Sequence, residues 1–198
     1  MKYVFVVTAL TAVLFGVGYT ICETESGQCE PVNSFNLVVN PSFEELTIDN
    51  RIPDGWLASG LSGSEGQDCT TASTDTCSFQ MSAHGANKVK TVSQMIDRQG
   101  FANDFGTFRV FVKSEGKAKG FPTYSAIFHH ADGTSETVTF PAEGGFHDWQ
   151  QYESVFTVSQ DYVSIEVVLT FGGAEHVWFD DVFLRLGPGI PPEVTITP

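Results

Sequence analysis

Basic residues are scarce in this 198-residue chain. Ten Lys and Arg stand against 24 Asp and Glu, which gives a formal net charge of −14 at pH 7, and the ten do not form a cluster anywhere in the sequence. Proteins that bind nucleic acid neutralise its phosphates with clustered Lys and Arg. The scarcity therefore argues against nucleic acid as a partner.

Catalytic signatures are also missing. The sequence contains no G-x-S-x-G, H-E-x-x-H or phosphate-loop pattern. A glycosidase needs two carboxylates that face each other across the substrate, about 5 to 10 Å apart. The conspicuous acidic pair, Asp180 and Asp181, consists of adjacent residues, which point to opposite faces of a strand, and the pair His129 and His130 diverges for the same reason. We therefore do not expect the chain to be an enzyme.

A long apolar run occurs only at the N-terminus. Lys2 is followed by 19 uncharged residues, Tyr3 to Ile21, as in a secretory signal. The run is also long enough to span a bilayer as a helix, and no A-x-A cleavage site follows it. Residues 1–21 are therefore predicted to form a hydrophobic leader helix, either a signal peptide or a membrane anchor, and we expect membrane contact only through this segment.

Cysteine is sparse, with four residues in two close pairs. Three connectivities are possible, and the short spacing favours the local pairing of Cys22 with Cys29 and of Cys69 with Cys77. Such bonds persist in oxidising compartments. The cysteines therefore agree with the leader, and we expect the protein to be secreted or displayed on the extracellular cell surface.

Helical periodicity is missing as well. Beyond residue 30 the chain consists of short or alternating apolar runs separated by Gly, Asp, Asn and Pro, which is typical of antiparallel strands. Asp132-Gly133 lies between two such runs and indicates a hairpin, because Gly tolerates the positive φ of a tight turn. The pattern predicts an all-β fold, an antiparallel β-sandwich or jelly roll.

The expected organisation has four parts. After the leader comes a Cys-containing segment, residues 22–35, and then the jelly-roll domain, residues 36–186. Residues 187–198 are rich in Pro and resemble an extended linker. The chain is therefore expected to hold one folded domain, and it could be a piece of a longer protein.

Several motifs occur in an order that resembles a known superfamily. "NLVVNPSFEE" is followed by "PDGW", "VSQMI", "FRVFVKS", "DWQQYESVFTV" and finally "VWFDDVFL". This order, over residues 36–184, is similar to galactose-binding-like jelly rolls, especially carbohydrate-binding modules. The resemblance implies a non-catalytic secreted or cell-surface module that binds a glycan or polysaccharide. The alternative is a structural or assembly protein, such as an adhesin, surface-layer or filament subunit, in which the jelly roll is a rigid structural unit.

The same resemblance implies a structural calcium. Its ligands would be Glu44, after the first strand, and Asp180 or Asp181 of the last strand. Calcium prefers six to eight oxygen ligands, and a carboxylate from each end of the chain would tie the sandwich together. Both aspartates can reach one site only if the strand contains a bulge. The alternative is that these acids form hydrogen bonds to turns and face water.

Sugar recognition needs exposed aromatic faces beside hydrogen-bonding groups. Alternation in residues 108–113 puts one apolar set on one face and a mixed charged and aromatic set on the other, whereas in residues 124–130 either face could be core. The predicted ligand-binding residues are Arg109, Phe111, Tyr124, Phe128 and His130. Trp56, Trp149 and Trp178 are expected to be packing residues.

The Pro-rich tail leads to a prediction about self-association. Residues 193–197 alternate as a short strand would, beyond a segment whose prolines lack amide donors. A linker is the expected role, and donation of this strand to a second copy is the alternative. If the strand is donated, deletion of residues 191–198 abolishes oligomers in analytical ultracentrifugation and leaves the melting temperature of the monomer unchanged. An intact chain that stays monomeric at high concentration leaves only the linker.

Overall fold

A computed structural model describes residues 20–21, 30–31, 36–48, 51–61, 65–82, 89–116, 121–173 and 176–188. The chain divides into two compact units, Met1–Phe35 and Asn36–Pro198. In the first unit, β1 (Thr20–Ile21) pairs antiparallel with β2 (Glu30–Pro31). The rest of the leader, the first cysteine pair and the tail beyond residue 188 lie outside the described residues, and no helix within the described part is long and apolar enough to cross a membrane.

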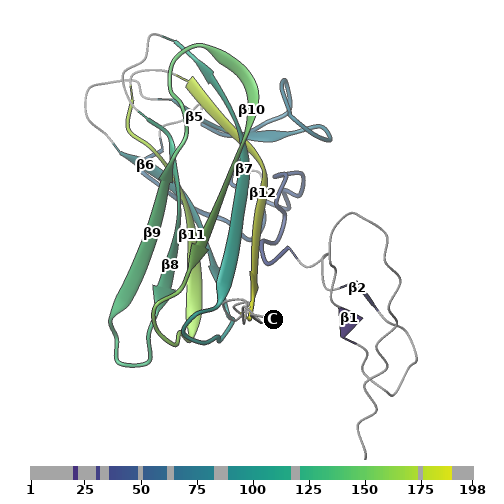
Figure 1. Ribbon diagram of the computed structural model, residues 1–198. Helices are drawn as coiled ribbons and strands as arrows, with labels where there is room; N and C mark the ends of the chain where they lie inside the picture. The colour runs from purple at the N-terminus through teal and green to yellow at the C-terminus, as the bar shows by residue number, and fades with distance from the viewer. Residues whose placement is uncertain are drawn as a thin grey trace, which may run out of the picture. The chain divides into compact units, whose positions relative to one another are not determined.

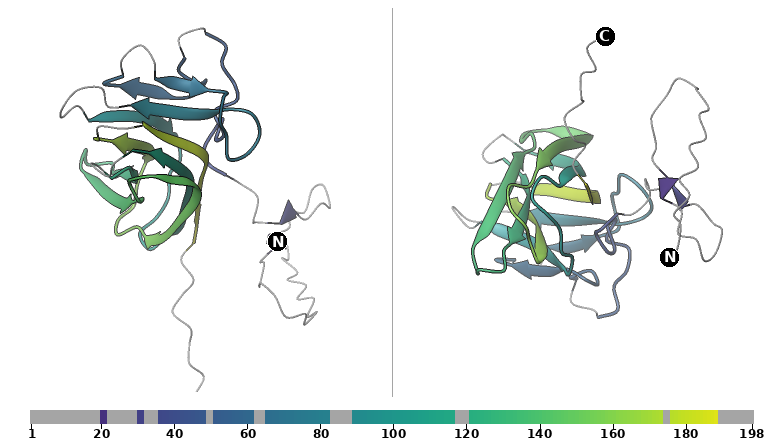
Figure 2. Two further views of the ribbon diagram at one scale, coloured as in Figure 1. Left: turned by 90° about the horizontal axis from the view of Figure 1, so that it is seen from above. Right: turned by 60° about the horizontal axis from the view of Figure 1, so that its bottom comes forward.

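The second unit is a sandwich of two five-stranded antiparallel sheets, stacked face to face (Figures 1 and 2). We name each sheet after its middle strand. The β12 sheet has the order β10 (His147–Thr157), β7 (Phe105–Glu115), β12 (His176–Gly187), β5 (Ser78–Ser82), β4 (Gly66–Asp68). The β11 sheet has the order β3 (Leu57–Ser59), β6 (Lys90–Ile96), β11 (Ser164–Phe171), β8 (Thr123–His129), β9 (Ser135–Pro141). The predicted all-β jelly roll is confirmed, with no helix among the described residues.

Strict alternation along the strands creates the core. On β7, Phe108, Val110 and Val112 are fully buried, whereas Arg109 and Phe111 are half-buried on the other side. The same period of two recurs on β11 and on β12 beyond Asp180, so apolar side chains from both sheets meet in one layer. The predicted division of residues 108–113 into a core face and an outer face is therefore confirmed.

Aromatic rings fill much of this layer. The ring of Phe128 on β8 lies with its centroid 5.1 Å from that of Tyr162 and 5.7 Å from that of Phe156 on β10. Gly106 on β7 is the strand partner of Phe156. A Cβ atom added at Gly106 would lie 2.1 Å from the ring of Phe156, so the glycine provides the room that this ring occupies.

The segment that follows residue 35 differs from the prediction. The first strand of the jelly roll is predicted to lie before Glu44, but residues 36–40 form no strand. Leu37 N instead donates to Leu184 O of β12 at 2.9 Å, and Val39 N donates to the Oε1 of Gln94 on β6 at 2.7 Å. The positive φ of Asn40, 49°, breaks the extended conformation. The segment therefore bonds to both sheets and bridges them.

The hairpin predicted at Asp132-Gly133 is present. β8 and β9 pair up to His129 and Ser135, and Gly133 has a φ of 85°. The connection is longer than a two-residue turn, because His130 N donates to Thr134 O at 2.9 Å across it. Asp132-Gly133 thus predicted the position of the turn correctly, although the turn is longer than the tight one expected.

A buried ion pair was not predicted. Lys90 on β6 pairs with Glu65, which precedes β4, and the side chains are 2% and 0% exposed. The Lys90 ammonium also donates to Ser82 O of β5. Desolvation lowers the pKa of Lys90. The pair joins the two sheets, and the loss of either partner would leave an uncompensated buried charge.

The close approach at Gly106 predicts a specific loss of stability. Gly106→Ala places a methyl group in the volume of the Phe156 ring and should lower the free energy of unfolding by about 1–3 kcal/mol, the usual cost of overpacking. Gly187→Ala is the matched control, since an added Cβ there meets nothing within 4 Å. Urea denaturation of both variants measures the difference, and equal stability would show that the Phe156 ring moves away freely.

Candidate functional site

The side of the β12 sheet that faces away from the core carries a mixture of aromatic and charged side chains, and we call it the outer face. Its residues follow from the strand register. Lys113 on β7 lies opposite Trp178 on β12, which lies opposite Gln80 on β5. Two residues before Lys113 on β7, Phe111 lies opposite Asp180 of β12. The outer face is therefore assembled from strands that are far apart in sequence.

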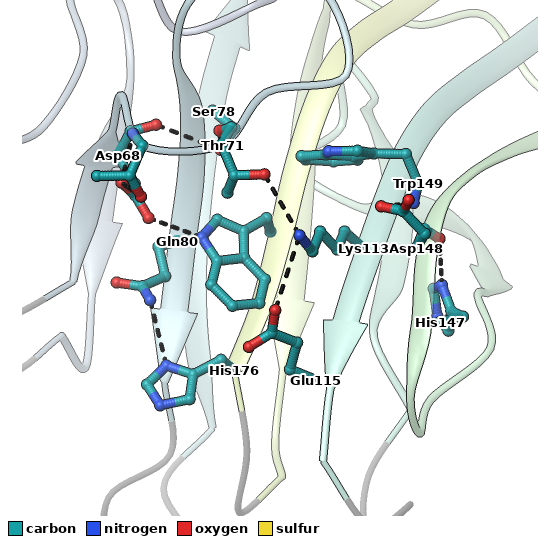
Figure 3. Close-up of polar contacts among 12 residues, drawn as sticks. Asp68, Thr71, Ser78, Gln80, Lys113, Glu115, His147, Asp148, Trp149 and His176 are labelled. Atoms are coloured by element: carbon teal, nitrogen blue, oxygen red, sulfur yellow. Dashed lines mark hydrogen bonds and ion pairs between the residues drawn. The ribbon is translucent and has the colours of Figure 1, made fainter.

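Trp178 is the centre of the polar contacts on this face, and Figure 3 labels its neighbours Asp68, Lys113 and His176. Its Nε1 donates to Asp68 Oδ2 at 2.8 Å, and the imidazole of His176 stacks on it with ring centroids 5.8 Å apart. The Lys113 ammonium lies 5.6 Å from the centroid of the Trp178 ring. Gln80 Nε2 in turn donates to His176 Nδ1 at 3.2 Å. Contacts with neighbours therefore hold the indole, which is only 6% exposed.

Lys113 has two further partners. Its Nζ lies 3.7 Å from Glu115 Oε1 and 3.4 Å from the hydroxyl of Thr71 (Figure 3). Trp149 lies on the same face of the sheet, in an irregularity of β10 between His147 and Gln150. The ring of Trp149 is half-buried, and its buried Nε1 has no hydrogen-bond partner. Of the three tryptophans, Trp56 and Trp178 are buried packing residues as predicted, and Trp149 is less enclosed than expected.

Arg109 and Phe111 lie where the sequence predicted, half-buried on the outer face. The guanidinium carbon of Arg109 lies 4.7 Å from the centroid of the Phe183 ring, a cation–π contact. Its Nε is buried and has no hydrogen-bond partner. The face thus offers rings and donors whose bonding capacity is not used up.

The other three predicted ligand-binding residues are not on any accessible face. Tyr124, Phe128 and His130 are 2%, 0% and 7% exposed. Tyr124 donates to or accepts from Ser154 Oγ at 2.8 Å, and His130 Nδ1 lies 2.8 Å from Asp161 O. Their prediction as exposed stacking residues was wrong. Both faces of residues 124–130 carry apolar groups, so alternation alone could not tell which side the core would take.

The acidic pair Asp180 and Asp181 lies at a β-bulge. The register of β12 against β7 shifts between Asp180 and Phe183, and Asp181 has a φ of 51°. The bulge separates the two aspartates. Asp180 is fully buried and Asp181 is half-buried.

The Asp180 carboxylate accepts backbone hydrogen bonds. Its Oδ2 accepts from Ser73 N at 2.7 Å and Thr74 N at 3.1 Å, and its Oδ1 accepts from Asp181 N at 2.7 Å. Burial raises the pKa of Asp180 to about 6, although the three amide donors oppose that rise. The Glu44 carboxylate also accepts two backbone hydrogen bonds, to its Oε1 from Thr76 N at 3.0 Å and from Cys77 N at 2.7 Å.

These contacts bear on the calcium that the resemblance implies. An amide N–H aimed at a carboxylate oxygen occupies a lone pair that a cation would need. In the part of the chain that the structure describes, no three His, Cys, Asp or Glu side chains gather as a metal site. Glu44, Asp180 and Asp181, as arranged here, do not fit a calcium ion, and calcium binding itself stays a prediction.

The predicted disulfide between Cys69 and Cys77 is confirmed, with the two Cα atoms 4.0 Å apart. It closes the connection between β4 and β5. The sequence did not identify Asp68, Gln80 and His176 as members of the outer face. They come together only through the strand order, which no local pattern specifies.

Comparisons with known proteins agree on the architecture. No protein-family model matches the sequence, and no curated protein matches it. Family 16 Carbohydrate Binding Module-2 superposes with a TM-score of 0.57 at 19% identity, over 76% of this chain and 99% of that chain. TmCBM61, solved in complex with beta-1,4-galactotriose, superposes with a TM-score of 0.55 at 15% identity, over 78% of this chain and 100% of that one.

The chain has the jelly-roll fold of carbohydrate-binding modules. The same jelly roll occurs in the enzymatically active domain of tailspike protein 4 from bacteriophage CBA120, with a TM-score of 0.58 and 16% identity over 77% of this chain. This chain spans 21% of that tailspike chain. The jelly roll therefore serves both as a separate module and as part of larger proteins, and its function must come from its surfaces.

The contact between Asp68 and Trp178 predicts a pH-dependent contribution to stability. Partial burial raises the pKa of Asp68, but the hydrogen bonds from Thr70 and Trp178, with the Arg51 charge, outweigh it and bring the pKa below 3.8. Asp68→Ala leaves the buried indole N–H unpaired and should cost about 1–3 kcal/mol of unfolding free energy. The cost should be complete above pH 3.8 and shrink as the pH falls through the lower pKa of the folded state.

Urea denaturation over a pH series measures this effect, and near-ultraviolet circular dichroism reports the indole environment. Asp148→Ala is the control, because the Asp148 side chain is exposed and accepts only the amide of its neighbour Trp149. If Asp68→Ala and Asp148→Ala have equal effects, Asp68 does not hold Trp178 in place.

Proposed function

We propose that the protein is a non-catalytic carbohydrate-binding module that holds its glycan on the outer face of the β12 sheet. The observation that carries the proposal is the coincidence on this face of half-buried rings with donors that lack partners. The rings are Phe111 and Trp149, and the donors are Arg109 Nε and Trp149 Nε1.

Sugars need this combination. The C–H groups of a pyranose pack on an aromatic face, and its hydroxyls accept hydrogen bonds from donors at the edge of that face. A buried donor without a partner costs about 1–3 kcal/mol, and an acceptor on a ligand recovers that cost once the half-buried side chain turns the donor outward. The outer face therefore gains from binding a hydroxyl-rich ligand in a way that an already satisfied surface would not.

The dimensions of the face suit a chain of sugars. Arg109, Phe111 and Lys113 follow one another at every second residue of β7. Successive outward side chains on a strand lie roughly 6.6 Å apart, so the three cover about 13 Å. A row of this length, with a ring between two cations, is better matched to an oligosaccharide than to one monosaccharide.

Other features support the remaining parts of the proposal. The carbohydrate-binding modules that share the fold support glycan binding as the class of function. The Cys69–Cys77 disulfide supports a secreted or cell-surface location, because such bonds persist in oxidising compartments. Binding without chemistry is the simplest role for a face built from rings and donors.

An assembly role is supported by the opposite side of the molecule. On the outside of the β11 sheet, Leu57 of β3 and Met95 of β6 are 70% and 54% exposed. They lie beside hydroxyl side chains such as Ser93, the strand partner of Leu57. A sheet face with exposed apolar groups suits contact with another protein subunit. Sedimentation of the full chain at rising concentration tests this role.

Two ring deletions test glycan binding. Phe111→Ala and Trp149→Ala should each weaken binding about tenfold, which corresponds to about 1.4 kcal/mol, because each removes a stacking surface from the outer face. A polysaccharide array with the wild-type chain identifies the ligand, and titration calorimetry with the best oligosaccharide measures the change. The melting temperature of both variants should stay close to that of the wild type.

Phe101→Ala is the matched control, since Phe101 is 71% exposed and precedes β7 outside the outer face. If the control loses affinity and the two variants do not, the glycan binds elsewhere. A loss of several kcal/mol of stability in the Phe111 or Trp149 variant would instead make that ring part of the packing.

A further inference from the structure

The connection between β4 and β5, residues 69–77, is closed on itself by the Cys69–Cys77 bond. The flanking strands bind it, because Ser78 Oγ of β5 donates to Thr71 O at 2.8 Å and the Asp68 carboxylate of β4 accepts from Thr70 N at 2.9 Å. The loop therefore has a defined shape that does not depend on an apolar core. We call it the disulfide loop.

The disulfide loop turns two pairs of backbone amides toward two acids. Thr76 N and Cys77 N donate to the carboxylate of Glu44, at 3.0 and 2.7 Å. Ser73 N and Thr74 N donate to the carboxylate of Asp180, at 2.7 and 3.1 Å. One short loop thus satisfies both carboxylates.

The two acids come from opposite ends of the folded unit. Glu44 lies in the segment that enters the sandwich, and Asp180 lies on β12, the last strand. The resemblance to carbohydrate-binding modules implies calcium ligands at these two positions. The loop brings four N–H donors to the place where the cation was expected.

We propose that the disulfide loop, in place of a metal ion, holds the first segment and the last strand of the jelly roll together. The amides stabilise the two carboxylates by hydrogen bonds, and the covalent bond keeps the amides in position. The fold is then independent of calcium and dependent on the oxidation of one cysteine pair. This inference does not rest on glycan binding.

The cost of losing the loop follows from burial. Asp180 is 0% exposed, and a buried carboxylate without donors is strongly unfavourable. The loop and the residue before it also hold two side chains of the outer face, because Asp68, at the end of β4, binds Trp178 and Thr71 of the loop contacts Lys113. Opening the disulfide should therefore weaken the contacts of the loop with Glu44 and Asp180 and, at the same time, its contacts with the outer face.

Melting temperatures test the proposal with matched cysteine variants of the full chain. Cys69→Ser/Cys77→Ser should melt about 5–15 °C below the wild type, as expected for the loss of a native disulfide in a domain of this size. Cys22→Ser/Cys29→Ser, which removes the other cysteine pair, is the control and should leave the melting of the sandwich unchanged. Excess chelator or added calcium should not shift the melting temperature of the oxidised wild type.

Amide hydrogen exchange tests the contacts themselves. In chelator, the amides of Ser73, Thr74, Thr76 and Cys77 should be protected in the oxidised wild type. Glu44→Ala should remove protection selectively at Thr76 and Cys77, whereas Asp180→Ala should remove it at Ser73 and Thr74, because alanine has no acceptor for these amides. The Glu44 variant keeps the test decisive if the Asp180 variant fails to fold.

Two results would overturn the proposal. One is a rise in the melting temperature of the oxidised wild type on adding calcium, with a matching fall in chelator, since the carboxylates would then hold a cation. The other is a Cys69→Ser/Cys77→Ser variant that melts with the wild type and keeps all four amides protected.

Discussion

Alternation of side chains along the strands is the constraint on which the rest of this structure depends. Each apolar residue that β7 or β12 gives to the core fixes its neighbours on the opposite face. Val110 and Val112 in the core therefore require Arg109, Phe111 and Lys113 outside. The packing of the core therefore determines which residues of β7 and β12 lie on the outer face.

The sequence predicts this division where the alternation is unambiguous. Residues 108–113 have one apolar face and one mixed face, and the structure agrees. Residues 124–130 are apolar on both faces, so the burial of Tyr124 and Phe128 depends on the second sheet, which no local pattern reveals. The contact of Trp178 with Asp68 depends on strand order in the same way. Composition and period thus predict the architecture, and tertiary pairing decides which residues meet.

The bulge at the two adjacent aspartates is the place where β12 exchanges one neighbouring segment for another. A bulge at Asp181 interrupts the alternation of β12, and beyond it the entering segment takes the place that β5 occupies before it. Leu37 binds Leu184 there, and the side-chain amide of Gln94 supplies a donor and an acceptor to Val39 as a neighbouring strand would. The first and last segments of the sandwich therefore meet at the bulge, where acidic side chains need donors.

The lengths of the outermost strands give the sandwich a polarity. On one side the sheets end in β3 and β4, three residues each, and the bridging segment bonds to both sheets. On the other side they end in β9 and β10, with seven and eleven residues. Only long edges present enough free amides and carbonyls to template an incoming strand. Any growth by edge pairing is thus directed to one flank, which leaves the opposite flank and both sheet faces unobstructed.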